Sequence, residues 1–319
     1  MLLPSESDAR IALGVVQAAF APVGGLDELQ HAVLGSLASS LYSLDLDDIL
    51  PAGASEIDAA NAAVRRQAVH LMVVVEFVEH HLRPEVSDRV EQFARELGVS
   101  LSLLRDARHL ARGHFAAMYL DLQRHSWYEE ETIRESLQGR WHELIRSKVA
   151  YEGGVADRAI ARRWCGLREC VPGTWGRAVA DFYDDHGFPF PGERHGIYEL
   201  GARHDWIHVL AGYGTSPEGE LDVFAFIGAS MADERGLVLL AITLGLFQNG
   251  AIRHMAGKRV VIARADTLSD PGAISRFTEA MRRGHVCPTD VMGTVDLFSC
   301  KDESLAAARE RLGVIPAQY

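Results

Sequence analysis

The sequence has 319 residues, enough for one large domain or two ordinary ones. Its 48% apolar and 24% charged residues are typical of a globular protein with a buried core. Its formal net charge of −12 argues against general nucleic-acid binding, which needs a basic surface. The four cysteines lack CxxC spacing and are too few for a disulfide framework, so we expect buried thiols in a reducing cytosol.

The first half of the chain is predicted to be helical throughout. Apolar residues recur there at helical spacing, and glycine or proline ends most of the segments, as in the run Pro22-Val-Gly24-Gly25. No alternation typical of β-strands is present. The predicted helices cover residues 9–20, 26–44, 56–82, 85–97, 101–123 and 129–150.

A glycine pair, Gly153-Gly154, marks the predicted boundary between a helical bundle, residues 1–150, and a second domain, residues 151–319. One short extended piece is expected at residues 259–264, and the fold class is all-α. The longest apolar run, residues 236–247, falls short of the roughly 20 residues that span a bilayer. The N-terminus has no basic flank typical of a signal peptide, so we expect a cytoplasmic protein. The helices of the second half are predicted at residues 156–167, 175–185, 198–210, 220–232, 236–255, 271–284 and 304–312.

Four residues form a candidate metal site. His204 and His208 are four residues apart, so both imidazoles leave one helix face, and Asp205 lies on an adjoining stripe. Glu220 follows a glycine-rich turn and begins the next helix, which would let its carboxylate return toward the histidines. This mixed nitrogen and oxygen set is suited to Zn²⁺, Fe²⁺ or Mn²⁺. Two histidines at this spacing are also common as ordinary surface or core residues, and the helix dipole alone would explain Glu220.

The spacing His-Asp-x-x-His, eleven residues and then Glu resembles the signature of the ubiquinone-biosynthesis protein four (coenzyme Q protein four) family. The likeness extends upstream over residues 170–183 and downstream over 280–284 and 308–314, and covers about residues 160–316. It implies that His204, Asp205, His208 and Glu220 are metal ligands in a mainly helical domain with an apolar channel. The first half resembles, more faintly, a tellurite-resistance TerB-type helical bundle.

The resemblance implies a metal-dependent enzyme of quinone or related prenylated aromatic biosynthesis, a lyase or oxidoreductase that replaces a ring carboxyl by hydroxyl. Asp205 and Glu220 are the candidates for a catalytic base, and Arg203 and Tyr213 for substrate contacts. We expect Zn²⁺, with Fe or Mn as alternatives, and an apolar, prenylated small-molecule substrate. We also expect a homo-oligomer, with biosynthetic enzymes as partners. The alternative is a lipid-binding scaffold in which a structural metal stabilises the fold and which organises such enzymes.

Two further sets of polar residues are candidates for function. Glu76, Glu79, His80 and His81, with Asp106, His109 and His114, are interpreted as a solvated face rather than a second metal site, because the repeated Glu-x-x-His pattern is missing. Between residues 253 and 285, seven Lys or Arg residues face three acids. This basic patch predicts a solvated helix face, or contact with a phosphate or with an anionic surface on the inner side of the membrane. Binding of nucleic acid is not expected.

Overall fold

The computed structural model describes residues 3–58, 61–114, 154–231, 233–250 and 265–318, and within these ranges the chain is built from helices without strands. The all-α prediction is therefore confirmed. An isolated antiparallel bridge joins Thr174 to Ser304. The chain separates into two compact units: Met1–Ser126 with Thr215–Val286, and Trp127–Gly214 with Cys287–Tyr319. None of the described helices is long and apolar enough to cross a membrane.

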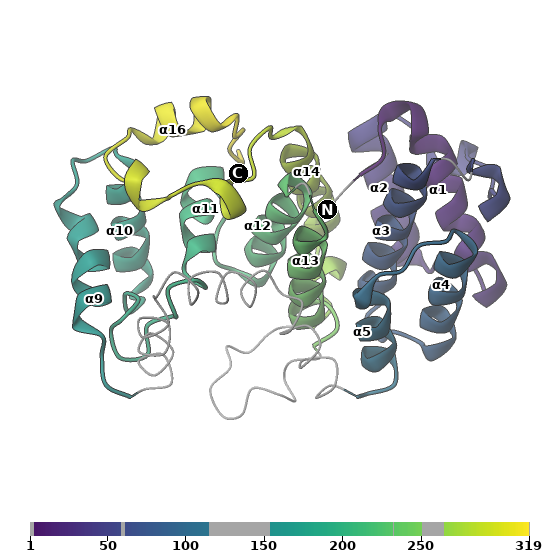
Figure 1. The fold of residues 1–319 in the computed structure, drawn as a ribbon, viewed down its shortest axis with the longest axis horizontal. Helices are drawn as coiled ribbons and strands as arrows, with labels where there is room; N and C mark the ends of the chain where they lie inside the picture. The colour runs from purple at the N-terminus through teal and green to yellow at the C-terminus, as the bar shows by residue number, and fades with distance from the viewer. Residues whose placement is uncertain (1–2, 59–60, 115–153, 232, 251–264, 319) are drawn as a thin grey trace. The chain divides into compact units, whose positions relative to one another are not determined.

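The first unit is built from helices of both of its chain segments. Helix α3 packs against α1, α2, α4, α5 and α13, and α12 packs against α13 and α14 (Figure 1). Gly284 makes the contact of α12 with α14 close, because a Cβ there would lie 2.2 Å from the carbonyl oxygen of Phe226. The helices are α1 (Glu6–Phe20), α2 (Glu28–Tyr42), α3 (Ala62–Val78), α4 (Pro84–Glu96), α5 (Ser102–Ala111), α12 (Pro217–Ser230), α13 (Glu234–Phe247) and α14 (Ala273–Val286).

The end of α3 is joined to the end of α13 by two amide side chains. Gln248, which is fully buried, donates to the carbonyl of Val78 at 3.0 Å, and Asn249 donates to that of Phe77 at 3.2 Å. The last carbonyls of a helix have no partner within the helix, so these bonds satisfy groups that burial would otherwise leave at a cost. These hydrogen bonds join the N-terminal half of the chain to a segment about 170 residues later.

The division of the chain differs from the boundary expected at Gly153-Gly154. Residues 215–250, expected in the C-terminal domain, pack with the N-terminal helices instead. The physical reason is that α13 is apolar around most of its circumference, so it needs cover on more than one side, and α3 and α12 supply it. The glycine pair itself lies at the edge of the described residues, and the extended piece at 259–264 and the helix at 129–150 lie outside them.

The set of polar residues expected to form a solvated face is partly buried. Glu76 is fully buried on α3, Asp106 is buried on α5, and Glu79 is buried and paired with Arg83. The interpretation as a solvated face was wrong for these three residues. For Glu76 the reason is that it lies within a long apolar run, on a helix that is covered on several sides. His81 is exposed, as expected.

Part of the basic patch is neutralised within the first unit. Arg276 forms an ion pair with the buried Asp222 at 2.6 Å, and Arg282 and Arg283 both pair with Glu279. Residues 253–264, with the remaining basic side chains, lie outside the described part of the chain. The three described basic residues of the patch are thus all paired with acids.

The second unit is assembled around buried aromatic rings. Trp164, Trp175 and Trp206 are almost completely buried, and the ring centroids of Trp175 and Trp206 lie 5.4 Å apart. Helix α16 contacts both α10 and α11 (Figure 1). The helices are α9 (Arg158–Cys165), α10 (Trp175–His186), α11 (Arg203–Ala211), α15 (Val291–Thr294) and α16 (Leu305–Leu312).

Candidate metal centre

The motif helix α11 is shorter than predicted and its start and end are well defined. It begins at Arg203 rather than at Tyr198, because the preceding residues form turns around Gly201. It ends at Gly212, whose φ of 76° is the left-handed conformation that glycine adopts readily, and the Gly212 amide donates to the carbonyl of His208. These two glycines place the motif on just over two turns of helix.

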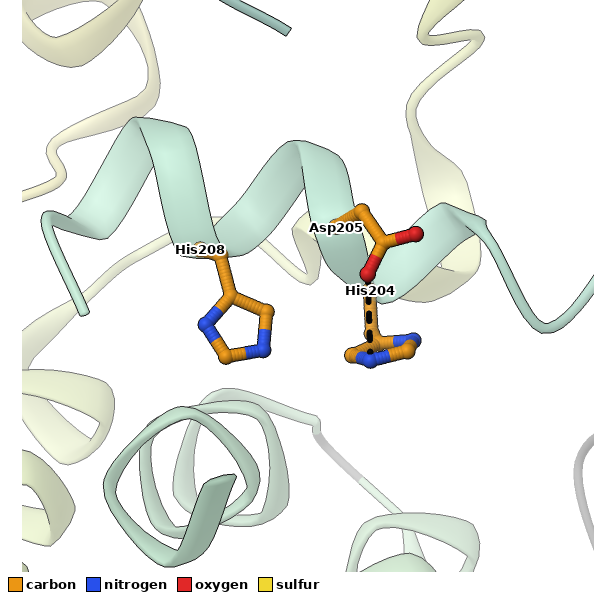
Figure 2. A group of neighbouring side chains, drawn as sticks. All are labelled: His204, Asp205 and His208. Atoms are coloured by element: carbon orange, nitrogen blue, oxygen red, sulfur yellow. Dashed lines mark ion pairs between the residues drawn. The ribbon is translucent and has the colours of Figure 1, made fainter. Parts of the chain in front are cut away.

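Three side chains of α11 converge on one point. One potential ligand atom each from His204, Asp205 and His208 lies within 4.8 Å of the other two, the one such group among the described residues. Figure 2 shows both imidazoles leaving the same side of the helix, with the Asp205 carboxylate beside the His204 ring. Asp205 and His208 are buried, with 8% and 1% of their surface exposed, and His204 is partly exposed. The predicted i, i+4 geometry is therefore present.

Backbone carbonyls fix which ring nitrogens carry a proton. The Nδ1 atom of His204 lies 2.5 Å from the carbonyl oxygen of Gly201, and Nδ1 of His208 lies 3.3 Å from that of Tyr213. A carbonyl oxygen only accepts, so each Nδ1 is the donor, and in the neutral imidazole Nε2 then carries the lone pair. This arrangement of a backbone acceptor behind the ring is typical of histidines that ligate metals.

The separation of His204 and Asp205 fits a small metal ion. Nε2 of His204 lies 3.2 Å from Oδ1 of Asp205, so a neutral imidazole and the carboxylate direct lone pairs at each other. A proton or a metal ion between the two atoms would stabilise them. Two donors bound at about 2.0 Å in tetrahedral geometry lie about 3.3 Å apart, close to the observed separation. A cation would also neutralise the negative charge of this buried carboxylate, because burying a charge without an opposite charge is costly.

Tyr183 of α10 holds the other oxygen of Asp205. Its hydroxyl donates to Oδ2 at 2.5 Å. Burial raises the pKa of Tyr183 well above its ordinary value, and the negative charge of Asp205 and the hydrogen bond raise it further, so the phenol stays protonated. Sequence reasoning missed this residue. The spacing of Val179, Ala180 and Tyr183 on one face predicts burial, but nothing in it points to a partner 22 residues later.

The rest of the second unit anchors α11 through its backbone. Trp175 Nε1 donates to the carbonyl of Trp206 at 3.1 Å, and Arg309 of α16 donates to the carbonyls of Val209 and Leu210. The amide of Ala317 donates to the carbonyl of Ala211 at 2.7 Å. Since a site is only as well defined as the elements that hold it, these bonds keep the three side chains in register.

The remaining predicted site residues have other surroundings. Arg203 donates to the carbonyls of Met292 and Val295, so its guanidinium joins α11 to α15, and the substrate contact predicted for it is untested. Tyr213 is buried and contributes its carbonyl to His208, while a role for its ring remains a prediction. Glu220 lies partly buried in the first turn of α12, which has Ser216 as its N-cap and Pro217 as its first residue, and belongs to the first unit. Its role as a ligand stays a prediction from the spacing.

Comparison of the chain with protein families, with curated proteins and with solved structures gave no match.

Proposed function

We propose that His204, Asp205 and His208 bind one divalent transition-metal ion and that this ion is the functional centre of the protein. The observation that supports this most directly is the pair of histidine rings whose Nδ1 atoms are held by backbone carbonyls, which leaves both Nε2 lone pairs on the side of the Asp205 carboxylate. Two imidazoles and one carboxylate suit Zn²⁺, with Fe²⁺ or Mn²⁺ as alternatives.

The proposed activity is that of a metal-dependent enzyme acting on an apolar, ring-bearing small molecule. Three protein donors are the usual number in catalytic zinc sites, which leave a position for water or substrate. When bound, such an ion supplies Lewis-acid chemistry. The likeness of the motif to the coenzyme Q protein four signature suggests a prenylated aromatic carboxylate as substrate and its oxidative decarboxylation, with O₂ as the oxidant, as reaction. Within this chain Asp205 and the two histidines would hold the ion, while Tyr183 orients the carboxylate.

The second candidate is a scaffold in which the metal is structural. The burial of His208 and Asp205 favours it, because structural sites are closed to water. A homo-oligomer, biosynthetic enzymes as partners and contact with a membrane surface are proposals that fit either candidate. The two candidates differ in whether the bound ion exchanges a water ligand and whether the protein turns over a substrate.

Metal analysis of purified protein tests the site. We expect about one equivalent of metal in the wild type and almost none in His204→Ala and His208→Ala, because each loses one of only three described donors. His186→Ala is the matched control: its imidazole is exposed on α10 and bonds to the carbonyl of Phe182, so its removal should leave the metal content unchanged.

Two results would decide against parts of the proposal. Equal metal content in the wild type and both histidine variants would contradict the site. The motif spacing predicts that Glu220→Gln also lowers the metal content. A wild-type metal content in this variant would exclude Glu220 as a ligand, and the site would then consist of His204, Asp205 and His208. To separate enzyme from scaffold, the metal-loaded protein is given a carboxylated prenyl-phenol, and release of CO₂ that is lost in Asp205→Asn supports the enzyme.

A further inference from the structure

The hydrogen bond between Tyr183 and Asp205 has a consequence for how the carboxylate can bind an ion. The phenol occupies Oδ2 at 2.5 Å, while Oδ1 is the oxygen that lies 3.2 Å from Nε2 of His204. The two oxygens of Asp205 thus have different partners. Of the two, it is Oδ1 that faces Nε2 of His204, the ring nitrogen that carries the lone pair.

Tyr183 is buried against other aromatic rings of the second unit. Its ring stacks on Phe190 with centroids 4.8 Å apart and planes 15° from parallel, and it lies 5.9 Å from the ring of Trp164. Only 1% of its surface is exposed. Helix α10, which carries it, is tied to α11 by the bond from Trp175 to the carbonyl of Trp206. The hydroxyl therefore cannot leave Oδ2 without displacing packed aromatic rings.

We infer that Tyr183 is a positioning residue that restricts Asp205 to coordination through Oδ1 alone and thereby selects a small transition-metal ion over Ca²⁺. This inference rests on the proposed metal site. A carboxylate that binds through one oxygen gives a set of two nitrogens and one oxygen from the described residues. Calcium takes six to eight oxygen ligands and often uses both oxygens of a carboxylate, so this set is poor for it. Zinc and its neighbours bind such mixed sets with low coordination numbers.

The variant Tyr183→Phe removes the hydroxyl and keeps the ring. We expect its affinity for Zn²⁺, measured by competition with a chromophoric chelator, to fall about 10- to 100-fold, as is typical when a group that orients a ligand is lost. We also expect the visible absorption bands of the Co²⁺-loaded protein to weaken, because a carboxylate free to bind through both oxygens raises the coordination number. A purely structural role for Tyr183 would lower the stability of the fold without altering this spectrum.

Tyr42→Phe is the matched control. Tyr42 is a buried tyrosine of the first unit whose hydroxyl donates to the carbonyl of Pro4 at 3.0 Å, so its variant also loses one buried hydrogen bond. It should keep the wild-type Zn²⁺ affinity and Co²⁺ spectrum. Wild-type affinity and spectrum in Tyr183→Phe would overturn the inference while leaving the metal site intact.

A measurement on the wild type alone does not depend on how well the variant folds. Millimolar Ca²⁺ should fail to displace Co²⁺ from the wild-type protein, and displacement would overturn the inference. A wild type that binds neither Zn²⁺ nor Co²⁺ would overturn both this inference and the proposed function.

Discussion

Replacing Glu76 by glutamine should stabilise the protein by about 2 to 4 kcal/mol at pH 8 and by almost nothing below pH 5. Glu76 is fully buried on α3. Burial raises the pKa of its carboxyl from 4.5 to about 8. The hydroxyl of Ser87 beside it opposes the shift, and the negative charges of Glu79 and Glu91 add to it. Between pH 4.5 and 8 the folded state therefore keeps a proton that the unfolded chain releases. The free energy of unfolding falls as the pH rises through this range.

Denaturant unfolding at pH values from 5 to 9 measures this effect. The free energy of unfolding of the wild type should fall across the window from pH 4.5 to 8 more steeply than that of Glu76→Gln. Glu96→Gln serves as the control, because Glu96 is 41% exposed at the end of α4 and its pair with Arg89 contributes little. Parallel pH profiles for the wild type and Glu76→Gln would contradict the account of this residue.

Replacing Trp206 by alanine should cost about 3 to 5 kcal/mol of stability and abolish metal binding. Trp206 is completely buried on α11, and its ring lies 5.3 Å from that of Phe298 and 5.4 Å from that of Trp175. The variant leaves a cavity inside the aromatic cluster that holds the motif helix, so the three ligands lose their fixed positions. Thermal unfolding and metal analysis of the same preparation measure the two effects.

Phe77→Ala separates loss of the site from loss of stability in general. Phe77 is equally buried, but it lies on α3 in the first unit. Its variant should also lose several kcal/mol, about as much as other buried phenylalanines, yet its folded fraction should keep the metal. A Trp206→Ala protein that retains one equivalent of metal would show that the aromatic cluster does not position the ligands.

Much of the helical fold can be predicted from this sequence because its signals are local. Apolar spacing with a clear stop predicted α1, α4 and α10 to within a few residues. The partners of the helices could not be predicted in the same way. The apolar run of α13 indicates burial, but its packing on α3 depends on the amides of Gln248 and Asn249, whose acceptors lie about 170 residues earlier.

The candidate site shows the same limit. The spacing of His204, Asp205 and His208 predicted three groups on one helix, and the structure brings them together. What holds them comes from elsewhere in the chain: the hydroxyl of Tyr183, and the guanidinium of Arg309 on the last helix. The missing Glu-x-x-His repeat predicts a solvated Glu76, whereas the packing around α3 shows it to be buried.

X-ray absorption at the zinc edge, on wild-type protein loaded with one equivalent of Zn²⁺, tests the proposed centre most directly. The nearest shell should consist of nitrogen and oxygen at about 2.0 Å, with the outer-shell scattering of two imidazole rings. His204→Ala should lose one of these rings. A sulfur shell at about 2.3 Å, or a spectrum without imidazole scattering, would place the ion elsewhere in the chain and contradict the account.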